Sequence, residues 1–336
     1  MKNFSSTRQN SYLFFTFAVA MQYLGEMISL GVACLWTVSA LSAEVASRRL
    51  GIFVMNVWRM ALAFVMSVAL MVAFTGTMGL GYASAEAWLW LLASGVVGYF
   101  FGDWCLFNSY LTIGSRYGQL LMTLAPMFTA LSAWVLLGQT LSWTALLAMA
   151  LTLSGIAISV RGSERSGEHP ESLPRKGILF GIGAALGQGL GLVLSKIGLD
   201  HYVASMPADL LPAVENYLPF SANSVRCIAG FVCFTSWYLI RRKSYRAEHQ
   251  TFTDSFQNRR GLLALLFTVL SGPFLGVGFS LMAVQHTAAG IASTLMATTP
   301  ILILWPSYYM FGQRITWRNV VGAVVSVVGV SLFFLL

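Results

Sequence analysis

The feature that most constrains this chain is a series of apolar stretches, each about 20 residues long and separated by short charged clusters. Only 10% of the 336 residues are charged and 57% are hydrophobic, which leaves too few charges for the surface of a soluble domain. Stretches of about 20 apolar residues match the thickness of a bilayer core. Only helices and closed barrels satisfy their backbone groups in lipid, and these stretches do not alternate like barrel strands. They predict an all-α membrane protein.

The pattern also divides the chain into segments. We place membrane-spanning segments near residues 26–46, 52–74, 88–110, 116–137, 142–160, 177–199, 220–240, 261–285, 289–311 and 316–336. The polar stretch 161–176 is the predicted linker between two halves, 26–160 and 177–336. Residues 1–25 form an N-terminal extension whose apolar part is short for a span. A translation start at Met21 and a signal-like segment are the alternatives for it.

The two halves are related by an internal repeat. An offset of 174 residues aligns these pairs without a gap: Gly98 and Gly272, Gly102 and Gly276, Pro126 and Pro300, Trp143 and Trp317, Gly155 and Gly329. Because the repeated unit has an odd number of spans, its two copies must cross the membrane in opposite directions. We therefore predict ten transmembrane helices in two inverted five-helix repeats. This architecture is typical of secondary transporters, which bind substrate between the halves.

Positive charge is concentrated in one set of connections. Most of the 20 Lys and Arg residues lie in or beside the odd-numbered connections, whereas the even-numbered ones carry acidic residues. The positive-inside rule places the linker in the cytoplasm and both termini outside it. We expect a multi-pass protein of the bacterial cytoplasmic (inner) membrane. The net charge of +8 has the same origin, so we expect no nucleic-acid partner.

The spans carry no motif for catalysis. The four Cys lie inside apolar segments, the four His are scattered, and nucleotide-binding and hydrolase motifs are absent from the sequence. Gly183, Gly187 and Gly191 recur every four residues, which is typical of close helix packing. We predict no catalytic residues, no metal site and no cofactor. The expected partners are a small-molecule substrate and the lipid bilayer, and homodimer formation is left open.

Ionisable side chains inside the spans are the first candidates for a functional site, because their burial in lipid is costly. Asp103 lies near the middle of the third segment, and its counterpart is Val277. It is suited to binding a cationic group or a coupling proton, with a structural hydrogen bond as the alternative. Glu44 and Lys196 are further candidates. Their structural alternatives are a salt bridge from Glu44 to Arg48 and snorkelling of Lys196 to the interface.

Other residues are weaker candidates. Aromatic and amide side chains suited to a polar cavity, or to ordinary packing, are Trp36, Trp104, Asn108, Gln188 and Gln285. Recurrence at equal spacing in the two halves favours a structural or gating role for Asn56, Arg59, Asn223 and Arg226. Pro126 and Pro300 fall mid-span, where each removes a helix hydrogen bond. They predict kinks in the fourth and ninth segments, for alternating access or as static curvature.

The segment PMFTALSAWVLLGQTL, which starts at Pro126, resembles the signature of EamA-type members of the drug/metabolite transporter superfamily, as does its echo from Pro300. Arg59, Arg226 and the late glycines of each half also fit this resemblance, which extends from about residue 26 onward. It implies a ten-helix inverted-repeat carrier, commonly an exporter of amino acids, metabolites or toxic compounds.

Two features depart from that family. Gln139 and Gln313 stand where its members usually have Glu, and many members have cytoplasmic termini. We expect a secondary transporter that exports small metabolites, amino acids or amphipathic compounds by alternating access, with proton coupling as a hypothesis. The alternatives are a membrane-embedded lipid-modifying enzyme, which needs clustered acids or histidines, and a non-transporting receptor or assembly factor, which large soluble domains would favour. The sequence has neither feature, and we expect no enzyme.

Overall fold

The structure is a computed structural model that describes residues 23–138, 142–163, 173–248, 251–286, 295–312 and 315–335. Every regular element in these ranges is a helix. Within them, six helices are long and apolar enough to cross a membrane, and two further apolar helices are shorter. Many of their large side chains are exposed, among them Trp143 and Trp317, as expected where lipid is the solvent. The chain is a helical, multi-pass membrane protein, as its apolar stretches predict.

The first half uses glycine to make tight connections. Its elements are α2 (Leu24–Leu50), α3 (Ile52–Thr75), η1 (Leu80–Tyr82), α4 (Ala85–Ser94), η2 (Gly95–Gly102), α5 (Asp103–Met122), α6 (Ala125–Leu137) and α7 (Trp143–Ser163). Gly51 alone joins α2 to α3, and Gly114 interrupts α5, with φ angles of 77° and 84°. Glycine adopts such angles at little cost. The part of α5 after Gly114 therefore belongs to the predicted segment 116–137.

The second half repeats this order with longer connections. Its elements are α8 (Arg175–Ser205), α9 (Leu211–Val214), η3 (Glu215–Tyr217), α10 (Leu218–Ile240), α11 (Arg242–Ala247), α12 (Phe252–Gln257), α13 (Arg259–Val269), η4 (Leu270–Phe274), α14 (Leu275–His286), α16 (Thr299–Leu302), α17 (Leu304–Phe311) and α18 (Trp317–Leu335). Both η2 and η4 are π-helical. They occupy equivalent places in the two halves, and such widened turns are frequent at functional sites.

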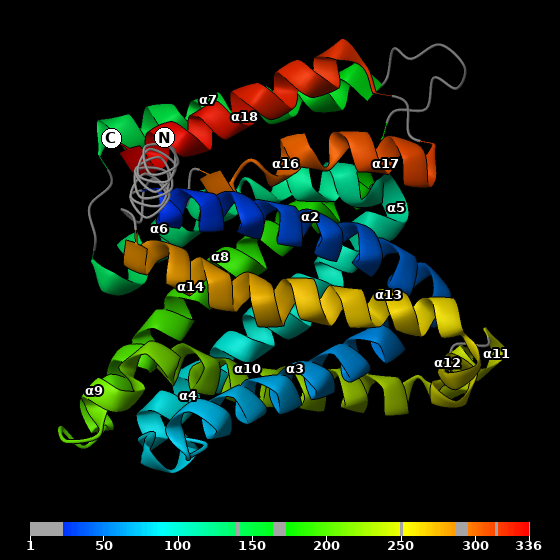
Figure 1. Cartoon of the computed structure of the whole chain (residues 1–336). Coiled ribbons are helices and arrows are strands. Elements are labelled where there is room, and N and C mark those ends of the chain that lie inside the picture. Colours follow the sequence, from blue (N-terminus) through cyan, green and yellow to red (C-terminus); the bar gives the residue numbers. More distant parts are fainter. Residues whose placement is uncertain are drawn as a thin grey trace, which may run out of the picture.

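Equivalent helices of the two halves pack against each other in opposite directions. Near one end of the α7–α18 pair, Asn319 Nδ2 donates to Ser159 O at 3.0 Å; further along, Ser326 Oγ donates to Thr152 O at 3.4 Å. The residue numbers rise along one helix as they fall along the other, so the helices are antiparallel. The equivalent pair α3 and α10 lies on the opposite side of the molecule (Figure 1). The two halves therefore have opposite orientations.

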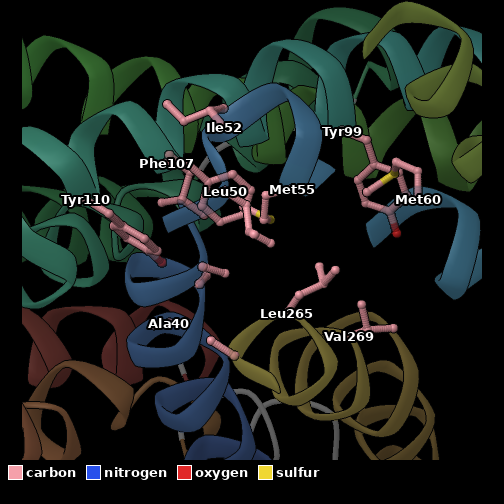
Figure 2. Packing of buried hydrophobic residues seen from close by; sticks show 14 of the residues in the cluster. Ala40, Leu50, Ile52, Met55, Met60, Tyr99, Phe107, Tyr110, Leu265 and Val269 are labelled. Carbon is pink, nitrogen blue, oxygen red and sulfur yellow. The ribbon is translucent and has the colours of Figure 1, made fainter. Parts of the chain in front are cut away.

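The largest buried cluster joins helices from both halves. It includes Met60 of α3, Tyr99 of η2, and Leu265 and Val269 of α13, and Figure 2 shows Met60 beside Tyr99. Lipid is as apolar as these side chains, so close packing and interhelical hydrogen bonds stabilise the contacts more than hydrophobic burial does.

The odd-numbered and even-numbered connections lie at different ends of the helices. At one end, Asn258 Nδ2 donates to Arg49 O at 3.0 Å, which brings the start of α13 to the turn after α2. At the other, Ser205 Oγ donates to Tyr82 O at 2.9 Å and links the connections that follow α3 and α8. The basic residues near Arg49 and those of α11 thus belong to the same end.

The two repeat-related prolines begin helices. The predicted fourth segment is broken at Thr123 and Leu124, and Pro126 lies in the first turn of α6. Pro300 has the same place in α16. A proline in the first turn removes no helical hydrogen bond, so each interruption precedes the proline and is not a kink at it. The described ranges leave out residues 1–22 of the predicted extension, 164–172 of the linker, and 287–294, which include the start of the ninth segment.

Candidate functional site

A buried ion pair lies where the two halves meet. Asp103, the first residue of α5, is only 1% exposed. Arg59 of α3 donates from Nη1 to Asp103 Oδ2, and its side chain is 11% exposed. Gln188 of α8 donates from Nε2 to Asp103 Oδ1 at 2.9 Å. Both carboxylate oxygens are therefore engaged, one by each half of the chain.

Glycines let α8 come close enough for Gln188 to reach Asp103. A Cβ atom on Gly187 would lie 2.7 Å from Gly102 Cα, and one on Gly191 would lie 2.8 Å from Gly98 Cα. These distances confirm the close packing predicted from the glycine spacing. The approach also lets Gln188 Nε2 donate to the carbonyl of Gly98 at 3.2 Å, which fixes the amide beside the π-helical turn.

A second arginine enters from the other half. Arg226 Cζ of α10 lies 4.4 Å from the centre of the Tyr99 ring, and the Tyr99 hydroxyl donates to Asn223 Oδ1. Gly95 makes this approach possible, because a Cβ there would lie 2.5 Å from the backbone oxygen of Arg226. A desolvated cation–π contact contributes about 2 kcal/mol, whereas removing a cation from water costs several kcal/mol. The contact with Tyr99 thus offsets only part of the free-energy cost of removing the Arg226 guanidinium from water.

We call these side chains the interface cluster: Arg59, Tyr99, Asp103, Gln188, Asn223 and Arg226. Each half supplies one Arg to the cluster from an equivalent position. Asn56, the counterpart of Asn223, lies beside it, and its Oδ1 accepts a hydrogen bond from Arg59 Nη1 at 3.4 Å. Among the described residues, the buried Nε atoms of Arg59 and Arg226 have no hydrogen-bond partner. The arrangement holds two partly buried guanidinium groups close to one buried carboxylate. Charges interact strongly away from water, so a change of charge at any of the three has a large energetic effect.

Glu44 makes contacts that hold α2 and α5 together. It is fully buried, and its Oε1 accepts from Arg48 Nη2 at 2.8 Å, the salt bridge that the sequence allows. Its Oε2 accepts from the backbone N of Ser115 at 2.7 Å. Ser115 follows the turn at Gly114, so the carboxylate satisfies a free donor where the next helical stretch begins.

Lys196 and Trp36 are not members of the interface cluster. Lys196 Nζ is 3.0 Å from Asp200 Oδ2, and the two side chains are 59% and 62% exposed. Trp36 of α2 packs against α14, since a Cβ on Gly276 would lie 2.8 Å from Trp36 Nε1.

The amide and aromatic candidates of the third segment make local contacts. Asn108 Nδ2 donates to the carbonyl of Trp104, one turn earlier, at 2.7 Å. The Trp104 ring meets that of Phe180 edge-on at 5.4 Å. The side chain of Gln285 lies outside the described part of the chain.

Tyr99 is the member of the cluster that the sequence analysis missed. It is four residues before Asp103, so the two share a helix face through the junction of η2 and α5. That spacing was a usable signal, but aromatic residues are abundant in this chain and give it little weight.

An open cleft lies at the end of the molecule that carries the odd-numbered connections. It measures about 530 Å³, and the residues that line it include Arg48, Gly51, Tyr245 and Glu248. The described members of the interface cluster are not part of its lining. This cleft is therefore separate from the interface cluster, in which Asp103 is buried.

The fold and the cluster define a class of protein: a helical membrane protein whose two equivalent, oppositely oriented halves enclose a buried charged cluster. Comparison with protein families gives the particular family. The model of the EamA-like transporter family matches residues 23–161 and again residues 175–335. The chain belongs to the EamA-like transporter family, which confirms the resemblance to drug/metabolite transporters. The family is one of membrane transporters.

Other comparisons bear on the fold alone. Fifteen chains of solved structures match, and one of them is described as "Crystal structure of protein". It has a TM-score of 0.58 and 14% sequence identity, and the match covers 92% of this chain and 95% of that chain. No curated protein matches this sequence.

The two Gln residues that depart from the family pattern, Gln139 and Gln313, lie outside the described residues.

Proposed function

We propose that this protein is a secondary transporter that exports small metabolites, amino acids or amphipathic compounds by alternating access. The observation that carries the proposal is the interface cluster, in which Arg59 and Asp103 of the first half meet Gln188 and Arg226 of the second. Buried ionisable groups in a membrane protein mark substrate and ion pathways. In carriers built from inverted repeats, the substrate site lies between the halves near the midplane.

The proposed membrane arrangement has ten spans in two inverted repeats, with both termini outside the cytoplasm. The antiparallel packing of α7 with α18 supports the inversion. The end that carries Arg49 and the basic residues of α11 would face the cytoplasm of a bacterial inner membrane. Rocking of one half against the other would then open the interface cluster to each side in turn.

Asp103 is the proposed coupling residue. Its carboxylate accepts hydrogen bonds from Arg59 and Gln188 in the observed packing of α3, α5 and α8. A movement of α3 or α8 away from α5 would remove those donors and leave a carboxylate in a low-dielectric region. A carboxylate without donors there favours its protonated form, so proton uptake at Asp103 would accompany one of the two access states.

The test is counterflow in proteoliposomes with a pooled panel of amino acids and metabolites, with and without a pH gradient. Wild type is compared with Asp103→Asn and with Asp200→Asn, a matched variant that removes an exposed carboxylate paired with Lys196. We expect gradient-dependent uptake in wild type and in Asp200→Asn, and loss of the gradient response in Asp103→Asn.

Two results would count against the proposal in different ways. If uptake changed neither with the pH gradient nor with Asp103→Asn, the protein would be a facilitator and Asp103 would have no coupling role. Absence of uptake of every compound, from protein that melts cooperatively, would argue for a receptor, an assembly factor or a lipid-directed activity in place of transport.

A further inference from the structure

The interface cluster has more positive than negative charge. Arg59 and Arg226 both interact electrostatically with Asp103. Two cations thus share one carboxylate, and the three side chains together carry a formal charge of +1. Both oxygens of that carboxylate already accept hydrogen bonds, from Arg59 and from Gln188. Arg226 forms no ion pair among the described residues. Within the described residues, Arg226 is therefore the cation of the cluster that has no ion-pair partner of its own.

The surroundings of Arg226 hold its guanidinium in place. One face lies on the Tyr99 ring, with Cζ 4.4 Å from the ring centre, and Tyr99 is itself fixed by its bond to Asn223. Gly98 gives the group room, because a Cβ at that position would lie 3.2 Å from Arg226 Nη2. A stacked guanidinium keeps its in-plane N–H donors available for a planar acceptor. The buried Nε of Arg226 has no hydrogen-bond partner among the residues that the structure describes.

The internal repeat accounts for the missing acid at Arg226. Arg59 and Arg226 occupy equivalent positions, but the acid that pairs with Arg59 is replaced by Val277 in the second half. The duplicated unit thus keeps its arginine and lacks the matching carboxylate. A cation buried in a membrane without a counter-charge is costly, and an anionic group from outside the chain would remove that cost.

We propose that Arg226 binds the carboxylate of a singly charged organic substrate, with Tyr99 and Gly98 shaping the site. The inference rests on the proposed transport function and specifies its substrate class. One carboxylate neutralises the formal charge of the cluster and matches the bidentate geometry of a guanidinium. A phosphate monoester carries between one and a half and two negative charges at neutral pH, so it would leave the cluster negative. Tyr99 and Phe107, whose rings face the arginines, suit a substrate with an apolar body.

The experiment compares matched compounds that differ only at the charged group. The probes are phenylpropionate, phenylpropionamide, phenethylamine and phenyl phosphate. Purified protein is tested for ligand-induced thermal stabilisation, and proteoliposomes are tested for uptake. The variants are Arg226→Gln, Arg226→Lys and Arg241→Gln. The last is a matched control, since Arg241 also stacks on an aromatic ring, with Cζ 5.9 Å from the ring of Trp237 at the end of α10.

We expect phenylpropionate to stabilise wild type and to be taken up, and the amide to do neither at equal concentration. Arg226→Gln should raise the apparent dissociation constant for phenylpropionate about 10- to 100-fold, the loss expected for a hydrogen bond to a charged group. Arg226→Lys should retain part of the affinity, because it keeps the charge but not the planar fork. Arg241→Gln should behave as wild type. Arg226→Lys also guards against misfolding, since its melting without ligand can be compared with wild type.

Several outcomes would overturn the assignment. Equal binding of the amide and the acid, or unchanged affinity in Arg226→Gln, would remove the carboxylate from Arg226. Stronger binding of phenyl phosphate would replace the singly charged class with a doubly charged one. Uptake of phenethylamine but not of phenylpropionate would leave the transport function standing and refute this substrate class. Neither binding nor uptake of any probe or pooled compound would refute both.

Discussion

Breaking the buried ion pair should cost much more than breaking a surface pair, and the order of the variants should follow the charge that remains. Wild type carries a formal +1 at Arg59, Arg226 and Asp103. Asp103→Asn leaves two cations without a counter-charge and should destabilise the protein by about 3–5 kcal/mol, the usual cost of removing one partner of a buried pair. Arg59→Gln should cost less, because Arg226 is close enough to interact with Asp103.

The double variant Arg59→Gln/Asp103→Asn restores the formal charge of +1. It should therefore be more stable than Asp103→Asn alone, with a coupling energy of about 2–3 kcal/mol in the double-mutant cycle. The control cycle uses Lys196→Gln and Asp200→Asn, an i,i+4 pair whose side chains are more than half exposed. Its coupling energy should stay below about 1 kcal/mol.

The assay is reversible unfolding by sodium dodecyl sulfate in mixed micelles, followed by tryptophan emission, with each cycle measured in one preparation. The reasoning would be refuted if the effects of Asp103→Asn and Arg59→Gln simply added. It would also be refuted if Arg59→Gln proved as damaging as Asp103→Asn, because Arg226 would then offer no alternative partner to the carboxylate.

Three further predictions concern packing, connection and topology. Gly155→Val should abolish cooperative melting, because even a Cβ there would lie 2.4 Å from a backbone nitrogen of α18. The control Gly31→Ala should melt as wild type, because a Cβ at Gly31 would have nothing within 4 Å. Glu44→Gln should lower the free energy of unfolding by about 1–3 kcal/mol through its buried contacts, with the pH response of uptake retained; loss of that response would place Glu44 in the coupling pathway. A cysteine replacing Glu86 should react with an impermeant maleimide in intact cells, and one replacing Arg246 only after permeabilisation; the reverse pattern would invert the topology.

The class of the protein could be predicted from its sequence because hydropathy, charge distribution and repeat spacing are properties of the chain itself. The apolar stretches predict the helical membrane fold, and the Gly183–Gly187–Gly191 spacing predicts the close helix contact observed on Gly98 and Gly102. The π-helical turns η2 and η4 were not predicted, because a widened turn depends on how a helix packs and has only a weak composition signal.

The membership of the site was decided by the tertiary structure. In the sequence, Glu44, Asp103 and Lys196 are comparable intramembrane charges, yet Glu44 contacts the backbone of Ser115 and Lys196 forms an exposed pair. Asp103 alone of the three meets a partner from the other half, at Gln188. Which groups meet depends on the rotation of each helix about its axis and on the distance between axes, and both are set by contacts between residues far apart in the chain. The sequence determined which polar side chains are inside the membrane protein, and the packing of η2 against α8 and α10 determined which of them form one cluster.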